Sequence, residues 1–162
     1  MEDPIEIQDD SYLQLQINEE TGFTYEKGIE ELLRHDPDVI LIGETRNSYT
    51  AKMVVRCALT GSLAFSTLHA SNTLEAIQRL EDLSISTYDL KNTLTALIGQ
   101  RLYKSANGKE CIYEILSGQD LQYVLEHKTY PKGFKTLSYE IKEALDTKRI
   151  QDPQAQFDLQ NL

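Results

Sequence analysis

Two side chains that could take part in catalysis each follow an apolar run of sequence. Glu44 comes just after Val39–Gly43, and His69 comes just after Leu63–Leu68. A carboxylate at the end of a buried strand can hold Mg²⁺, directly or through water, or polarise an attacking water. An imidazole at the end of a neighbouring strand can position that water or contact a phosphate. Each pattern taken alone is also typical of a residue with no catalytic role.

Charged side chains of both signs occur close to these two positions. Three carboxylates are grouped at Glu2, Asp3 and Glu6, a cluster that is also typical of a solvated acidic segment. Arg34 and Arg46 lie before and after the first apolar run. Arginine suits bidentate contact with phosphate, although exposed arginines at helix ends are common.

Both reactive side chains depend on a strand, helix, strand unit for their position. Val39–Ile42 is a β-branched and apolar run that predicts a strand buried on both faces, and Leu63–Thr67 predicts a second. Between them, Asn47 or Ser48 can cap a helix whose apolar positions follow the helical repeat: Ala51, Val54, Val55, Ala58 and Leu59. The spacing predicts a parallel strand pair, so the carboxyl ends of both strands should meet at one edge.

The remaining segments predict a mixed α/β chain. The expected elements are a strand at Tyr12–Asn18, helices from Thr24 to near His35, from Asn72 to Asp82 and over Tyr88–Ile98, a hairpin pairing Leu102–Ser105 with Glu110–Leu116 around Asn107-Gly108, and helices over Leu121–His127 and Leu137–Lys148. The segment from Gln151 is polar and predicts a frayed tail.

Composition narrows the classes of function. The net charge of −10 argues against non-specific binding to nucleic acid or to an anionic membrane. No apolar run approaches the roughly 20 residues of a membrane helix. Cys57 and Cys111 are the only cysteines, so they predict buried, reduced thiols in a cytosolic protein rather than a disulfide framework or a four-thiolate zinc site.

The motifs, taken together and in order, resemble those of the type II/IV secretion ATPases, which drive type II secretion, type IV pili and competence pseudopili. Leu33–Arg46 resembles the Walker B region, Ala58–Asn72 the His box and Glu2–Glu6 the Asp box of that family. Further matches lie at Ala76–Leu80, Gly99–Leu102, Ile112–Leu116 and Gly133–Leu137. The resemblance covers residues 1–148.

The resemblance implies a fold and a division into domains. Residues 1–102 would form the C-terminal half of a RecA-like P-loop ATPase core with a parallel sheet. Residues 103–150 would form a small hairpin and helical subdomain, and residues 151–162 a polar tail.

The resemblance also implies catalytic roles, with ATP and Mg²⁺ as the cofactors. Glu44 would be the Walker B acid through which Mg²⁺ is held, and His69 would lie near the γ-phosphate. Glu2 and Glu6 belong to the Asp box, and one of them is a candidate to polarise water.

Four more residues would be associated with the nucleotide or the metal. Asp3 completes the Asp box. Arg34 and Arg46 are candidates to complete a site within one subunit or across a subunit interface. Thr67 would support the geometry of the loop.

The sequence departs from the family pattern in three ways. It contains no G-x-x-x-x-G-K-[ST] run, the main phosphate cradle, so we expect a fragment that binds ATP poorly and does not hydrolyse it alone. Asn47 stands where the family usually has Asp. A short turn over Tyr103–Glu110 replaces the four-Cys module of many secretion members, which predicts no zinc and favours the competence branch.

The function implied by the resemblance is that of a hexameric motor at the cytoplasmic face of the membrane. It would act on an inner-membrane platform protein, be peripheral to the membrane and make no direct contact with nucleic acid. A second hypothesis is a non-catalytic module for ring assembly or platform binding. A third is an unrelated α/β protein in which the motifs occur by chance.

Overall fold

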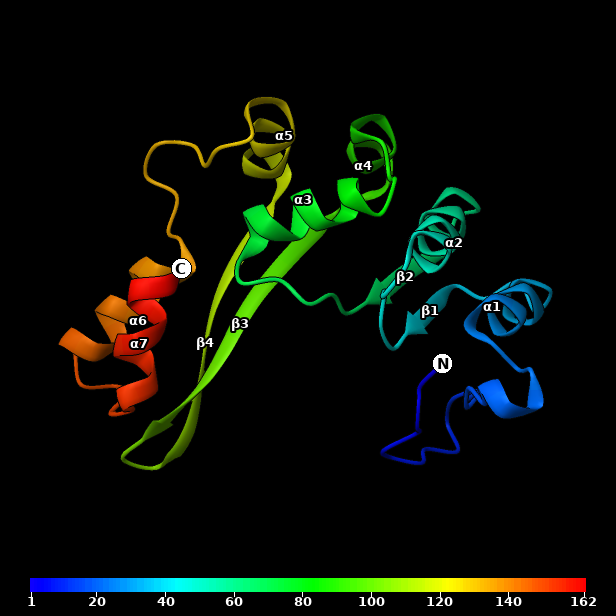
Figure 1. The fold of residues 1–162 in the computed structure, drawn as a ribbon, viewed down its shortest axis with the longest axis horizontal. Coiled ribbons are helices and arrows are strands. Elements are labelled where there is room, and N and C mark those ends of the chain that lie inside the picture. The colour runs from blue at the N-terminus through cyan, green and yellow to red at the C-terminus, as the bar shows by residue number, and fades with distance from the viewer. The chain divides into compact units, whose positions relative to one another are not determined.

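The computed structural model describes residues 1–162 as two compact units (Figure 1). The first unit contains Met1–His69 and Leu80–Thr93, and the second contains Ala70–Arg79 and Leu94–Leu162. The chain therefore passes between the units three times, after His69, after Arg79 and after Thr93. The predicted domain limits at residues 102 and 150 stay a prediction.

The first unit is built on the predicted strand, helix, strand unit. Strands β1 (Val39–Ile42) and β2 (Leu63–Ser66) pair in parallel, with Ile42 opposite Ser66. Helix α2 (Ser48–Leu59) connects them and begins where the Asn47 side chain accepts a 2.8 Å hydrogen bond from the Thr50 amide. The α/β class with a parallel strand pair is confirmed.

The predicted burial of both faces of these strands is wrong. Ile40 and Ile42 are buried against α1 (Tyr25–Leu33) and α2, together with Ile29, Met53 and Cys57. The opposite face is about half exposed at Val39, Leu41, Leu63 and Phe65, with values from 50% to 56%. Both helices pack on one side of the strand pair, so only alternate residues are covered.

Two predicted boundaries in this unit also differ. Tyr12–Asn18 is not a strand: it makes only isolated bridges, Glu2 with Gln16 and Asn18 with Phe23, before the 3-10 helix η1 (Glu19–Thr21). Leu13 is exposed, but Ile17 is buried and Leu15 packs against the same core, so part of the alternating face is covered although no neighbouring strand pairs with the segment. Helix α4 (Thr87–Thr93) ends well before Ile98, because the residues from Ala96 onward pair in the hairpin.

The second unit contains a long antiparallel hairpin. Strands β3 (Ala96–Ser105) and β4 (Gly108–Ser117) pair along their whole length. The turn between them is Ala106-Asn107, one residue before the predicted Asn107-Gly108, because Gly108 already pairs with Ser105. Gly108 has φ +125°, a conformation that side chains disfavour. Helix α3 (Thr73–Asp82) begins in this unit, where the Asn72 side chain accepts a hydrogen bond from the Glu75 amide as predicted.

Three further helices complete the second unit. They are α5 (Gly118–His127), α6 (Leu137–Asp146) and α7 (Pro153–Asn161). One core cluster joins Tyr103 and Ile112 of the hairpin to Ile141 of α6 and Ala155 of α7. The segment predicted to fray is therefore a helix, which Asp152 caps and Pro153 starts.

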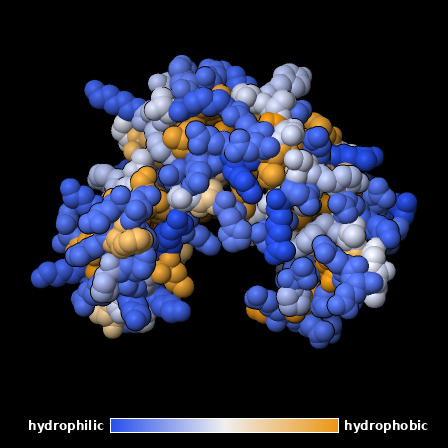
Figure 2. Space-filling view, in the orientation of Figure 1, coloured by the Kyte–Doolittle hydropathy of each residue, from blue (hydrophilic) through white to orange (hydrophobic).

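The surface and the cysteines complete the description. Hydrophilic side chains cover most of the face drawn in Figure 2, in keeping with the high charge of the chain. None of the seven α-helices has the length and apolar character needed to cross a membrane. Cys57 is buried as predicted, but Cys111 is exposed because it lies on the outward face of β4.

Candidate functional site

The ends of β1 and β2 are held together by three hydrogen bonds. The Thr67 hydroxyl donates to the Gly43 carbonyl at 2.6 Å, and the Thr45 amide donates to the Thr67 carbonyl at 2.9 Å. The hydroxyls of Thr45 and Ser66 lie 2.8 Å apart. The parallel register therefore continues into both loops, and it brings Glu44 and His69 to the same edge of the sheet.

Both oxygens of the Glu44 carboxylate have a partner. Oε1 lies 3.1 Å from His69 Nε2, and Oε2 accepts a 2.7 Å hydrogen bond from Arg46 Nε. The Glu44 side chain is only 18% exposed, while those of His69 and Arg46 are 92% and 63% exposed. A sheltered carboxylate thus holds two cationic or hydrogen-bonding groups that remain open to a ligand. The hydrogen bond that Arg46 donates to Glu44 also raises the pKa of Arg46 above its ordinary value.

The acidic segment lies beside the end of β1. The Met1 nitrogen donates to the Leu41 carbonyl at 2.7 Å, and the Gly43 amide donates to the Met1 carbonyl at 2.8 Å. On its other side, Glu2 exchanges backbone hydrogen bonds with residues 15 and 17. A Cβ on Gly43 would lie 3.0 Å from the Met1 carbonyl oxygen, closer than ordinary contacts, so glycine permits this approach.

Tyr25 is a residue of this site that the sequence analysis did not single out; it lies in the helix predicted from Thr24 to near His35. Its hydroxyl lies 3.3 Å from the position of a Cβ on Gly43. Burial raises the pKa of Tyr25, and the nearby carboxylate of Asp3 raises it further, with smaller effects from Glu44 and Glu2. Two of the three predicted acidic residues, Glu2 and Asp3, are therefore near Glu44. The sequence signal that could have identified Tyr25 is its residue type, because the hydroxyl of a tyrosine that packs on a core needs a polar partner.

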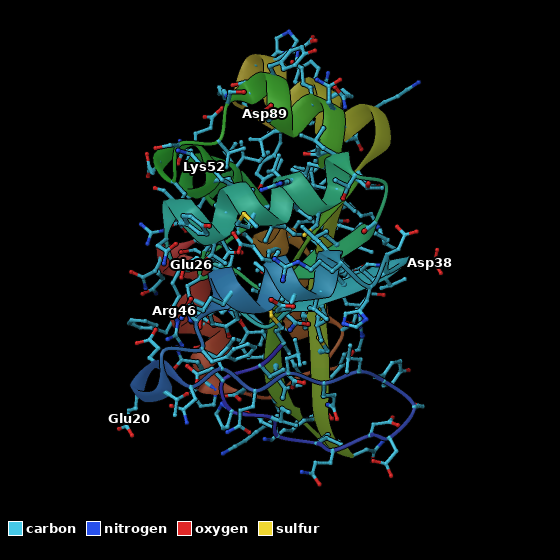
Figure 3. All side chains as sticks on the ribbon, turned by 90° about the vertical axis from the view of Figure 1, so that its right-hand side faces the viewer. Glu20, Glu26, Asp38, Arg46, Lys52 and Asp89 are labelled. Carbon is cyan, nitrogen blue, oxygen red and sulfur yellow. The ribbon has the colours of Figure 1, made fainter.

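Two predicted residues lie away from this cluster. Arg34 forms the C-terminal cap of α1 and makes an ion pair with Glu31, which raises the pKa of Arg34. It precedes β1, whereas Arg46 follows it; in Figure 3, Asp38 and Arg46, which flank β1, lie on opposite sides of the view. Glu6 is exposed and has no hydrogen bond or ion pair in the structure. The structure brings together Glu44, His69, Arg46, Thr67, Glu2 and Asp3.

The oxygen ligands at this edge fit Mg²⁺ better than a closed metal site. No group of three or more His, Cys, Asp or Glu side chains is arranged to hold a metal ion. Mg²⁺ is usually bound through one or two carboxylates, with waters and substrate phosphates completing its shell. A single sheltered carboxylate such as Glu44 fits that mode of binding.

The chain matches known proteins over most of its length. The sequence model of the type II/IV secretion system protein family matches residues 1–145. The competence protein ComGA of Bacillus subtilis is 37% identical over 144 residues, which cover 78% of this chain and 40% of that protein. The protein transport protein HofB homolog of Haemophilus influenzae is 34% identical over 168 residues, which cover 92% of this chain and 36% of that protein.

A solved structure has the same fold. The ATPase DotB of Legionella pneumophila superposes with a TM-score of 0.75 at 20% identity, covering 99% of this chain and 50% of that chain. At this identity the likeness shows the fold alone. The chain spans about 40% of the length of ComGA and 36% of the HofB homolog.

Proposed function

Because the chain belongs to the type II/IV secretion system protein family, we propose that it forms part of a motor ATPase that powers assembly of a pilus or pseudopilus for secretion or DNA uptake. The observation that carries this proposal is the 3.1 Å contact between Glu44 and His69 at the carboxyl edge of a parallel strand pair. Ligands of open α/β sheets bind at this edge, and phosphoryl transfer requires an acid there to hold Mg²⁺ or to orient water.

In this proposal Glu44 is the Walker B acid. Mg²⁺, when bound, neutralises charge on the β- and γ-phosphate oxygens, and Glu44 would hold it directly or through water. His69 is open to solvent on the far side of its contact with Glu44, so its ring can face the γ-phosphate. Arg46 fixes the second oxygen of Glu44 and keeps its other donors free.

The acidic segment and Arg34 have more indirect roles in the proposal. Glu2 lies beside the end of β1, from where it can polarise a water, and Asp3 adds negative charge around the metal. Glu6 is less well placed, since it is exposed and makes no hydrogen bond or ion pair. Arg34 lies before β1, so we assign it to a site across a subunit interface rather than to the Glu44 of its own chain.

The phosphate cradle of this proposal comes from outside the 162 residues, which contain no G-x-x-x-x-G-K-[ST] run. Backbone N–H groups and the lysine of such a loop supply most of the affinity for the β- and γ-phosphates. We therefore expect these 162 residues alone to bind ATP poorly and to leave it unhydrolysed.

We propose a hexameric ring at the cytoplasmic face of the membrane, acting on an inner-membrane platform protein. The similarity to a competence protein favours the DNA-uptake branch. The net charge of −10 supports a role in which the filament, rather than this chain, meets the DNA.

The test measures ATP hydrolysis by the protein as its organism makes it. Glu44→Gln and His69→Ala should each lower kcat roughly 10²- to 10⁴-fold, the range for loss of a group that moves or orients a proton. Glu20→Gln removes an exposed carboxylate from η1 (Figure 3) and should leave kcat unchanged.

The opposite outcome has a defined meaning. If the wild-type protein hydrolyses no ATP, or if Glu44→Gln hydrolyses it as fast as the wild type, the catalytic proposal fails. The non-catalytic module for ring assembly or platform binding would then be the better account.

A further inference from the structure

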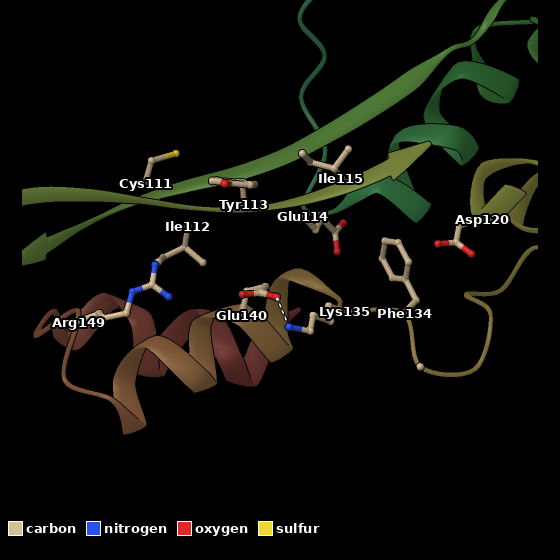
Figure 4. A pocket seen from close by; sticks show the side chains of 11 residues that line it. Cys111, Ile112, Tyr113, Glu114, Ile115, Asp120, Phe134, Lys135, Glu140 and Arg149 are labelled. Atoms are coloured by element: carbon tan, nitrogen blue, oxygen red, sulfur yellow. Dashed lines mark ion pairs between the residues drawn. The ribbon is translucent and has the colours of Figure 1, made fainter. Parts of the chain in front are cut away.

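Glu114 is a buried carboxylate in the second unit, on the side of β4 that faces α6 (Figure 4). Only 2% of the residue is exposed. Its Oε1 accepts a 2.6 Å hydrogen bond from the Thr73 amide and a 3.2 Å bond from the Tyr130 hydroxyl. Its Oε2 accepts a 2.5 Å bond from the Leu137 amide. A buried carboxylate is costly unless it is well satisfied, and Glu114 has three donors.

The two amides that Glu114 binds are the first residues of two helices. Thr73 starts α3 and Leu137 starts α6. Free N–H groups and the positive end of the helix dipole make a helix start a favourable partner for a carboxylate. Gly99 on β3 lies opposite, where a Cβ would lie 3.2 Å from Glu114 Cγ, so the strand pair leaves room for this side chain. One side chain thus joins the hairpin to the starts of both helices.

The residues just before α3 are held by the same unit. Arg101 Nη2 donates to the Ser71 carbonyl at 3.0 Å, and the Tyr130 hydroxyl accepts from the Leu74 amide at 3.1 Å. Residues 71–74 are therefore fixed to β3, β4 and Tyr130. His69 is only two residues before Ser71. A two-residue separation allows at most about 7 Å between their Cα atoms, so this anchor limits where His69 can be.

From these contacts we propose that Glu114 is a positioning residue for His69. Residues 69–73 connect the two contacts. His69 at the start of this segment contacts Glu44, and Thr73 at its end is held by Glu114. This inference rests on the proposed role of His69 for its relevance to catalysis. The first of the three passages of the chain between the two compact units is at His69 and Ala70, so this segment is a covalent link from the Glu44 site to the anchored start of α3.

The experiment compares variants of the 162-residue chain by NMR without nucleotide. Glu114→Ala should speed amide exchange at Thr73 and Leu74 roughly ten- to a hundredfold, the effect of losing a hydrogen bond to a charged group. It should also shift or broaden the imidazole signal of His69, assigned with His69→Gln. The signals of His35 and His127 serve as internal references. Glu114→Gln keeps the shape and one acceptor, so it should have a smaller effect and remain folded if Glu114→Ala does not.

A matched control separates positioning from general loss of stability. Asp158→Asn weakens a partly buried contact of the second unit, the 2.6 Å hydrogen bond from the Tyr103 hydroxyl to Asp158. When Asp158→Asn lowers the melting temperature as much as a Glu114 variant does, Asp158→Asn should still leave the His69 signal unchanged. The proposal is overturned if the His69 signal is unaffected by either Glu114 variant, or if Asp158→Asn changes it as much. Since no nucleotide is present, this result is independent of the ATPase test.

Discussion

The Thr67 hydroxyl donates a 2.6 Å hydrogen bond to the Gly43 carbonyl and so links the two strand ends that carry His69 and Glu44. The bond runs between residues 24 positions apart in the chain, and it lies beside the backbone bond from Thr45 to Thr67. The geometry of the candidate site therefore depends on a contact that closes the β1, α2, β2 unit at its carboxyl edge.

Removing this hydroxyl should loosen the edge by a modest amount. Thr67→Val keeps the shape of the side chain but leaves the Gly43 carbonyl to water, so we expect a loss of about 0.5 kcal/mol, the low end for one hydrogen bond at an exposed position. Thr67→Ser keeps the donor and should match the wild type. Urea unfolding followed by circular dichroism measures both, and equal midpoints for Val and wild type would contradict the role of this bond.

Arg46 should matter for hydrolysis more than other surface cations. Arg46→Gln removes the 2.7 Å ion pair that fixes Glu44, and we expect kcat of the complete protein to fall roughly tenfold, as for loss of a hydrogen bond between charged groups. Lys52→Gln removes the same charge from the exposed side of α2 and should have no effect. A kcat for Arg46→Gln equal to that of Lys52→Gln would mean that Glu44 needs no such partner.

Stability should fall at alkaline pH because of buried tyrosine. Burial, and the nearby carboxylate of Asp158, raise the pKa of Tyr103 well above its ordinary value. The folded state then keeps this proton after the unfolded state has lost it, so the stabilisation is complete below about pH 10 and is lost as pH rises beyond it. The slope is up to about 1.4 kcal/mol per pH unit for one group.

The check is urea unfolding between pH 8 and pH 11 for the wild type and for Tyr103→Phe. The variant loses the hydrogen bond to Asp158 and should be less stable at pH 8, but its stability should fall less steeply with pH. Parallel curves would show that Tyr103 does not supply the pH dependence. Burial also raises the pKa of Tyr25 and Tyr130, so some slope should remain in the variant.

The two thiols should differ in reactivity. Cys111 is exposed, whereas Cys57 is fully buried and burial raises its thiol pKa, which lowers the fraction of reactive thiolate. A maleimide reagent should therefore label one site in the native chain and both in urea. Native labelling should disappear in Cys111→Ser. Fast labelling of Cys57 in the native chain would contradict its position in the core of the first unit.

The sequence predicted correctly those features that depend on residues only a few positions apart, such as the helix caps. The caps at Thr24, Asn47 and Asn72 accept the expected amides, because a capping hydrogen bond spans only three residues. The hairpin forms where the Asn107-Gly108 pair predicted it, but its turn residues are Ala106 and Asn107, and Gly108 already pairs with Ser105. The strand at Tyr12–Asn18 was wrong because no neighbouring strand pairs with it, although Ile17 is buried. The helix predicted over Tyr88–Ile98 forms but ends at Thr93, because β4 pairs with its last predicted residues.

The spacing of strand, helix and strand was enough to predict the parallel β1, α2, β2 unit and the order of motifs around it, because it leaves few ways to connect the chain. Which side chains meet depends on how the elements pack. That packing paired Glu44 with both His69 and Arg46, placed Asp3 near Tyr25, left Arg34 with Glu31, and buried Glu114 under two helix starts. Most of these contacts join residues that are distant in sequence. A carboxylate becomes buried among hydrogen-bond donors only when other helices or strands pack around it, and the residues next to it in sequence do not specify that packing.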